Sequence, residues 1–276
     1  MSRLLERAVA YGLERLEHLA ERRYSDAPLC KAPLAGDAEY LRRWEQAKAE
    51  SYPAIDEFER AAGAAIEPDW FHQLGLLTQV VIKPSPPCYQ HGRLLYASLR
   101  RYIRERGGQA LNIVETGTAR GFSALCMAKA LEDAGTTGKI ATFDVLPHDT
   151  PIFWNCIRDT DGPCTRGDLL AGYADLVERS VVFHRGDTRL ALRRIAFPRV
   201  HFAFLDSVHT YDHVMAEFAA IGGHQRPGDM LFFDDYTPGA YPGVVAAADE
   251  ICRSHGYTRT VVEARADRRY LVAEKR

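Results

Sequence analysis

The alternation of short apolar runs with longer amphipathic stretches beyond residue 88 restricts the possible folds most strongly. The apolar runs are rich in β-branched and aromatic residues, and they predict strands at 112–115, 140–144, 181–184, 201–206 and 230–234. Helical patterns fall around and between them at 94–102, 123–133, 169–179, 189–195, 214–221 and 244–255. Strands that alternate with helices in this way form a mostly parallel sheet with helices on both faces.

The end of the chain predicts an antiparallel hairpin at one edge of this sheet. Its two apolar runs, 260–263 and 270–273, are joined through Ala266 and Asp267. Together with the five parallel strands they give a Rossmann-like, doubly wound α/β fold with a mostly parallel, seven-stranded sheet. We expect this domain to occupy residues 89–276.

Residues 1–88 have a helical pattern instead. Apolar residues recur every three or four positions at 5–19, a second helix is expected after Asp37 as N-cap, and a third at 55–62. The proline-rich segment 83–87 marks the boundary with the α/β domain, because proline fixes its own φ and disfavours helix before it. Three roles for this extension stay open: a structural cap, a substrate lid, and a contact through which the chain forms a homo-oligomer.

Composition excludes several classes of protein. Lys and Arg number 35 against 37 Asp and Glu, and no long basic stripe is present, so nucleic acid is not expected as a partner. The longest uncharged runs, 70–82 and 236–248, are shorter than the roughly 18–20 residues that cross a bilayer, so no membrane partner is expected. Six cysteines without a Cys-x-x-Cys pair and a charged N-terminus without a visible export signal predict a cytoplasmic location.

The loop after the first strand, Glu115-Thr116-Gly117-Thr118-Ala119-Arg120-Gly121, is the first candidate binding site. Ligands of open α/β sheets bind beyond the carboxyl ends of the strands, and this spacing departs from the Gly-x-Gly-x-x-Gly pattern that accommodates a pyrophosphate. The loop resembles motif I of class I S-adenosylmethionine (SAM)-dependent methyltransferases. The resemblance implies that Glu115, Gly117, Thr118 and Gly121 bind the cofactor, and that a branched side chain at Gly117 would obstruct its methionine tail.

Two aspartates after the next strands extend this resemblance. Asp144 ends the second strand, where its carboxylate would accept hydrogen bonds from both ribose hydroxyls. Asp187 follows the third strand, and in methyltransferases of this type a matching acid commonly faces the adenine amino group. The alternative for each aspartate is to cap the following helix. Arg120 would pair either with a cofactor carboxylate or with Glu115.

Three further carboxylates follow two strands that we expect to be adjacent: Asp206 after the fourth strand, and Asp234 and Asp235 after the fifth. Parallel neighbours bring them to one place, where like charges repel unless a cation neutralises them. Carboxylate oxygens suit Mg²⁺, so these three residues form a candidate metal site. This part of the chain resembles the metal-dependent small-molecule O-methyltransferases, including the macrolide-sugar type and the related cephalosporin hydroxylase-like group. The resemblance extends over roughly residues 89–276.

One departure concerns the base. The catechol-type enzymes of this kind carry a lysine near the metal, whereas His209 stands three residues after Asp206. His209 would accept the proton of a substrate hydroxyl beside Asp206, because the unperturbed pKa of histidine lies near operating pH; the alternative is a hydrogen bond to a backbone carbonyl. We therefore expect Mg²⁺-dependent methylation of a hydroxyl on a sugar or natural product. The alternatives are a hydroxylase-associated member of the same superfamily and a catalytically silent, cofactor-binding interaction subunit.

Overall fold

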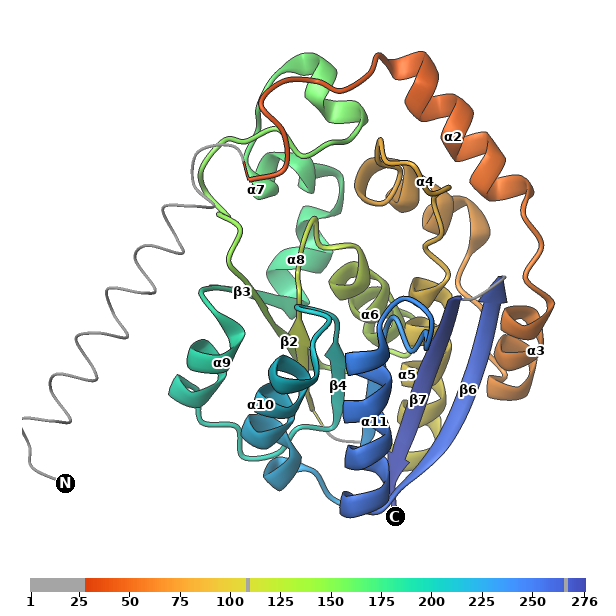
Figure 1. The fold of residues 1–276 in the computed structure, drawn as a ribbon, viewed down its shortest axis with the longest axis vertical. Coiled ribbons are helices and arrows are strands. Elements are labelled where there is room, and N and C mark those ends of the chain that lie inside the picture. Colours follow the sequence, from red (N-terminus) through yellow and green to blue (C-terminus); the bar gives the residue numbers. More distant parts are fainter. Residues whose placement is uncertain (1–27, 108–109, 266–267) are drawn as a thin grey trace, which may run out of the picture.

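The computed structural model describes residues 28–107, 110–265 and 268–276, and a single seven-stranded sheet forms its centre (Figure 1). The strands are β1 (Leu111–Thr116), β2 (Gly138–Asp144), β3 (Val181–Arg185), β4 (Phe202–Leu205), β5 (Met230–Phe233), β6 (Tyr257–Arg265) and β7 (Arg268–Lys275). Their order is β3-β2-β1-β4-β5-β7-β6, and β7 runs antiparallel to both of its neighbours. The predicted doubly wound sheet with an antiparallel edge hairpin is confirmed.

Helices cover both faces of the sheet. They are α2 (Asp37–Ala49), α3 (Pro53–Ala62), α4 (Pro68–Thr78), α5 (His91–Arg106), α6 (Phe122–Asp133), α7 (Arg166–Leu169), α8 (Ala174–Ser180), α9 (Thr188–Ala191), α10 (Tyr211–Ile221) and α11 (Pro242–His255). Along β4, Phe202 and Phe204 pack with α5 and α6, whereas Ala203 and Leu205 pack with α10 and α11. Because both faces are buried, the central strands are continuous apolar runs. Within the described ranges, no helix combines the length and the apolar composition that crossing a bilayer requires.

The register of the parallel strands brings the candidate site residues to one edge. Thr116 at the end of β1 pairs with Leu205 at the end of β4, and Leu205 pairs with Phe233 at the end of β5. The residues that follow these strands, Gly117 and Asp206 among them, therefore lie together.

The described part of the N-terminal extension packs on the main domain. Tyr40 of α2, Ile55 of α3 and Leu74 of α4 lie in the same buried core as residues of α5 and α6. Helix α3 lies beside β6, as Figure 1 shows. The helix expected at 5–19 lies outside the described residues, and the roles of oligomer contact and lid stay predictions.

Three local features differ from expectation. Asp37 is the first residue of α2 and does not cap it, because the glycine before it holds the N-cap position. Helix α4 was not expected, although Pro68 at its start and the Glu67 carboxylate, which accepts two backbone N–H groups, are typical helix-start signals. The helix expected at 169–179 is divided into α7, a 3₁₀ turn and α8.

Candidate active site

The glycine loop between β1 and α6 packs against the end of β4. Gly117 has φ +86°, and a Cβ atom there would lie 2.0 Å from the carbonyl oxygen of Asp206. A side chain at Gly117 would thus collide with the backbone of Asp206, and the expected obstruction of the methionine tail stays a prediction. Gly121 has φ +91°, and its Cβ would lie 2.8 Å from Leu170. Both glycines permit close packing of the loop.

Glu115 and Thr118 belong to a buried network of hydroxyl groups beneath this loop. Glu115 is fully buried, and its two carboxylate oxygens accept hydrogen bonds from the hydroxyls of Ser123 and Thr142. Thr118 shares a hydrogen bond with the same Thr142 hydroxyl. Burial raises the pKa of Glu115 to about 7, although the two hydroxyls oppose this shift. These buried hydrogen bonds hold the loop in its conformation. Direct contacts of Glu115 and Thr118 with the cofactor stay predictions.

Asp144 and Asp187 both bind backbone groups. Asp144 accepts the N–H of Ala119 in the glycine loop at 2.6 Å and that of Leu146 at 2.8 Å. Asp187 caps α9, accepting the N–H of Arg189 at 3.0 Å, and pairs with the Arg189 guanidinium, which lowers its pKa. The capping alternative is therefore realised at Asp187, whereas Asp144 holds the end of β2 against the glycine loop. Contacts of either aspartate with ribose or adenine stay predictions.

Arg120 binds the segment around Trp154 and not Glu115 in the described part of the chain, and its pairing with a cofactor carboxylate stays a prediction. Its Nε donates to the carbonyl oxygen of Trp154 at 2.6 Å. Trp154 is fully buried in the segment between β2 and α7, where its indole N–H donates to the backbone carbonyl oxygen of Cys164. Arg120 therefore joins the glycine loop to this segment.

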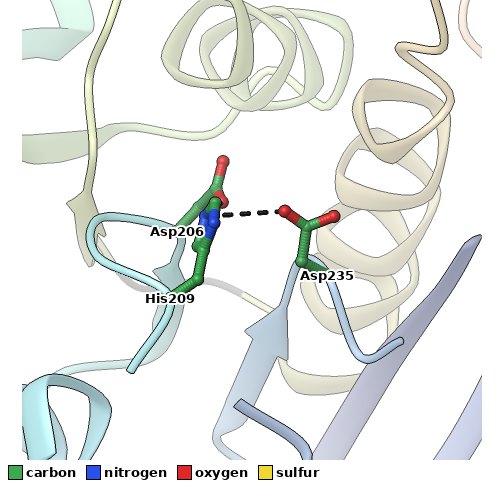
Figure 2. A group of neighbouring side chains, drawn as sticks. All are labelled: Asp206, His209 and Asp235. Atoms are coloured by element: carbon green, nitrogen blue, oxygen red, sulfur yellow. Dashed lines mark hydrogen bonds and ion pairs between the residues drawn. The ribbon is translucent and has the colours of Figure 1, made fainter. Parts of the chain in front are cut away.

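Asp206, His209 and Asp235 form a compact group at the ends of β4 and β5 (Figure 2). His209 Nε2 lies 3.2 Å from Asp206 Oδ1 and 3.5 Å from Asp235 Oδ2. One ligand atom from each residue lies within 4.8 Å of the others. Asp235 has φ +52°, a strained conformation for a residue with a side chain, which is frequent at functional sites. The structure thus brings the predicted base together with two of the three predicted metal ligands.

The electrostatics of this group favour an additional positive charge. Burial, followed by the charge of Asp234, raises the pKa of Asp206 to about 8 and that of Asp235 to about 6. The hydrogen bond to Asp206 raises the pKa of His209. Buried carboxylates that repel one another retain protons unless a cation compensates their charge. The two carboxylates of Asp206 and Asp235 fit a divalent cation.

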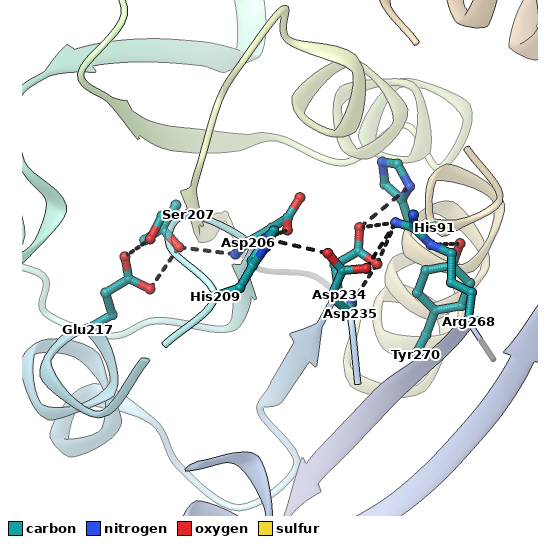
Figure 3. A network of polar contacts seen from close by, with 10 residues as sticks. His91, Asp206, Ser207, His209, Glu217, Asp234, Asp235, Arg268 and Tyr270 are labelled. Carbon is teal, nitrogen blue, oxygen red and sulfur yellow. Dashed lines mark hydrogen bonds and ion pairs between the residues drawn. The ribbon is translucent and has the colours of Figure 1, made fainter. Parts of the chain in front are cut away.

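Asp234 lies outside this group, and its expected role as a third metal ligand stays a prediction. Arg268 Nη2 donates to both of its oxygens, at 2.8 and 2.9 Å (Figure 3). The Asp234 side chain is only 3% exposed, and although burial alone would raise its pKa, the charge of Arg268 lowers it. His91 Nδ1 lies 3.9 Å from the same carboxylate. Asp234 therefore already has a cationic partner within the chain.

Arg268 was not among the predicted site residues. It stands at the start of β7, and the antiparallel pairing of β7 with β5 brings it to Asp234. The predicted final strand began only at residue 270, and the pairing of the hairpin with the fifth strand was not predicted, so the sequence contained no direct signal for Arg268. The ring of Tyr241 lies 4.6 Å from that of His209 in an edge-on arrangement.

The strand order, the glycine loop after β1 and the carboxylates beyond β2 and β4 define the fold of class I methyltransferases. Residues 114–236, from β1 to just beyond β5, match the family model of a methyltransferase domain. This part of the chain is therefore similar to a methyltransferase domain, and its fold is the one that the glycine loop predicted. No curated protein sequence matches the chain.

Solved structures share this fold at low sequence identity. The O-methyltransferase NovP aligns with a TM-score of 0.52 and 15% identity over 67% of this chain and 79% of its own. TomG from Streptomyces achromogenes, an O-methyltransferase involved in tomaymycin synthesis and solved with SAM, has a TM-score of 0.50 and 18% identity over 76% and 91%. The methyltransferase PaMTH1 from Podospora anserina, solved with SAH, has a TM-score of 0.50 and 12% identity over 89% and 99%. At such identities the likeness concerns the fold.

Proposed function

We propose that the protein transfers a methyl group from SAM to a hydroxyl of a small molecule with the help of a divalent cation. The observation that carries the proposal is the group of Asp206, His209 and Asp235 at the strand ends beside the glycine loop. NovP and TomG, which share the fold, are named O-methyltransferases. The near-zero formal net charge of −2 favours a small substrate over nucleic acid.

The residues of the group have distinct roles in this reaction. Methyl transfer from a sulfonium is an in-line displacement, so the chain must hold the attacking oxygen about 3 Å from the methyl carbon. Asp206 and Asp235 would hold the cation, Mg²⁺ in the simplest case, and it supplies positive charge that makes a neighbouring hydroxyl more acidic. His209 would accept the hydroxyl proton, and it would do so at Nδ1, because its Nε2 is engaged by the Asp206 carboxylate. The substrate class that suits such a site is a hydroxylated sugar or natural product.

The test uses SAM with a labelled methyl group and a panel of hydroxylated sugars, vicinal aromatic diols and polyketides. We expect labelled product that disappears in EDTA and returns with Mg²⁺ or Mn²⁺. Full activity in EDTA would contradict the role of the cation. SAM binding without label transfer to any member of the panel would favour a silent cofactor-binding subunit, and product without label would favour the hydroxylase-associated alternative.

A further inference from the structure

Glu217 of α10 is a buried carboxylate that binds three loops at once. Its side chain is 1% exposed, and its oxygens accept hydrogen bonds from the hydroxyls of Thr116 at 3.0 Å, Thr188 at 2.5 Å and Ser207. His213 Nε2 lies 3.4 Å from the same carboxylate. Figure 3 shows Glu217 and Ser207 on the side of Asp206 that faces away from Arg268.

Each of the three hydroxyls belongs to the neighbour of a candidate site residue. The adjacent pairs are Thr116 with Gly117, Thr188 with Asp187, and Ser207 with Asp206. Thr116 is the last residue of β1, Thr188 the first residue of α9, and Ser207 lies in the loop after β4, so no single turn or helix cap explains the three contacts. Thr116 also accepts the backbone N–H of Asp206, through its carbonyl oxygen at 3.1 Å and its hydroxyl at 3.3 Å. Glu217 thus contacts the glycine loop, the loop before α9 and the loop of Asp206.

Burying a carboxylate at this position costs free energy, which its hydrogen bonds to the three hydroxyls offset. Burial raises the pKa of Glu217, although the three hydroxyls oppose this shift. An apolar side chain of similar size would pack α10 without that penalty, since α10 already buries Val214, Phe218 and Ile221. The specific gain from the carboxylate is the relative placement of the three loops.

We propose that Glu217 is a positioning residue that holds the glycine loop and the loop of Asp206 in the arrangement that binds the cofactor beside the cation. This inference rests on the proposed function. Because Glu217→Gln retains the size of the side chain but replaces one acceptor oxygen with a donor, at least one hydroxyl loses its acceptor. The loss of one buried hydrogen bond corresponds to about a tenfold change in binding when the loops must be ordered for the ligand.

The experiment measures SAH affinity by calorimetry in the full chain, with and without Mn²⁺, for wild type, Glu217→Gln, Ser207→Ala and the double variant. Glu59→Gln is the matched control. Glu59 lies in the extension and is also buried, but it pairs with Arg93 of α5. We expect Glu217→Gln and Ser207→Ala each to weaken SAH binding about tenfold, and the double variant to lose little more, because the two groups act through one contact. The Glu59→Gln control should retain wild-type affinity.

Unchanged SAH affinity in Glu217→Gln, or losses that add in the double variant, would overturn the inference while leaving the proposed function intact. An equal loss of SAH affinity in Glu59→Gln would mean that the effect is general destabilisation, and it would also overturn the inference. A wild-type chain that binds no SAH would instead remove the proposed function and the inference with it. If Glu217→Gln does not fold, SAH affinity is measured in Ser207→Ala and Thr188→Val instead. Wild-type SAH affinity in both variants overturns the inference.

Discussion

Replacing Asp206 with Asn should stabilise the protein when no divalent cation is present. Burial and the charge of Asp234 raise the pKa of Asp206 from its ordinary 3.8 to about 8. Between these two values the folded chain binds more protons at this position than the unfolded chain does, so stability falls as pH rises through the window. Asparagine does not ionise, so the variant does not lose stability in this way as the pH rises.

The magnitude follows from the width of that window. At pH 7 the unfolded-state pKa lies about 3 units below the pH, and each unit corresponds to about 1.4 kcal/mol, which gives an upper limit of about 4 kcal/mol. The Asp206 side chain is 23% exposed, so water screens part of this penalty. We therefore expect Asp206→Asn to raise the free energy of unfolding by about 2 kcal/mol, equivalent to a Tm increase of about 4–8 °C.

The assay is thermal unfolding in EDTA at pH 5 and pH 7.5, with the exposed Asp175→Asn as control. The stability advantage of Asp206→Asn should be larger at pH 7.5 than at pH 5. Saturating Mn²⁺ or Mg²⁺ should raise the Tm of wild type more than that of the variant, because ligand binding to the folded state adds stability. A variant less stable than wild type in EDTA at pH 7.5 would refute this account of the site.

Three other substitutions test neighbouring parts of the site. Gly117→Ala should lower the free energy of unfolding in urea by about 1–3 kcal/mol, because its Cβ would meet the Asp206 carbonyl; wild-type stability would contradict the packing of the loop. His209→Asn should lower turnover at least about 100-fold without changing Mn²⁺ affinity by electron paramagnetic resonance, whereas loss of affinity would make His209 a ligand. Arg268→Met should destabilise the fold by about 3–5 kcal/mol in urea, because Asp234 is left buried without its partner; unchanged stability would refute the pair.

The five parallel strands were predictable to within one or two residues because local sequence patterns encode them. The run from Met230 is apolar on both faces, as a strand between two helical layers requires, and β5 ends at Phe233. Helix α4 was missed because its residues from Trp70 onward form a long uncharged run without a clear amphipathic pattern. The cap at Asp187 shows the same ambiguity at the site, since an acid after a strand suits both a ligand and a helix N-terminus.

The amino-acid sequence alone determined the α/β architecture, the glycine loop and the positions of the acids after the strands, because these depend on spacing along one stretch of chain. Only the tertiary structure decided which acids lie beside His209 and which one pairs most closely with Arg268. Arg268 reaches Asp234 through the pairing of β7 with β5, and Glu217 reaches hydroxyls from three loops through the packing of α10. The charge state of a carboxylate depends on every group within a few ångströms, and here those groups come from distant parts of the chain.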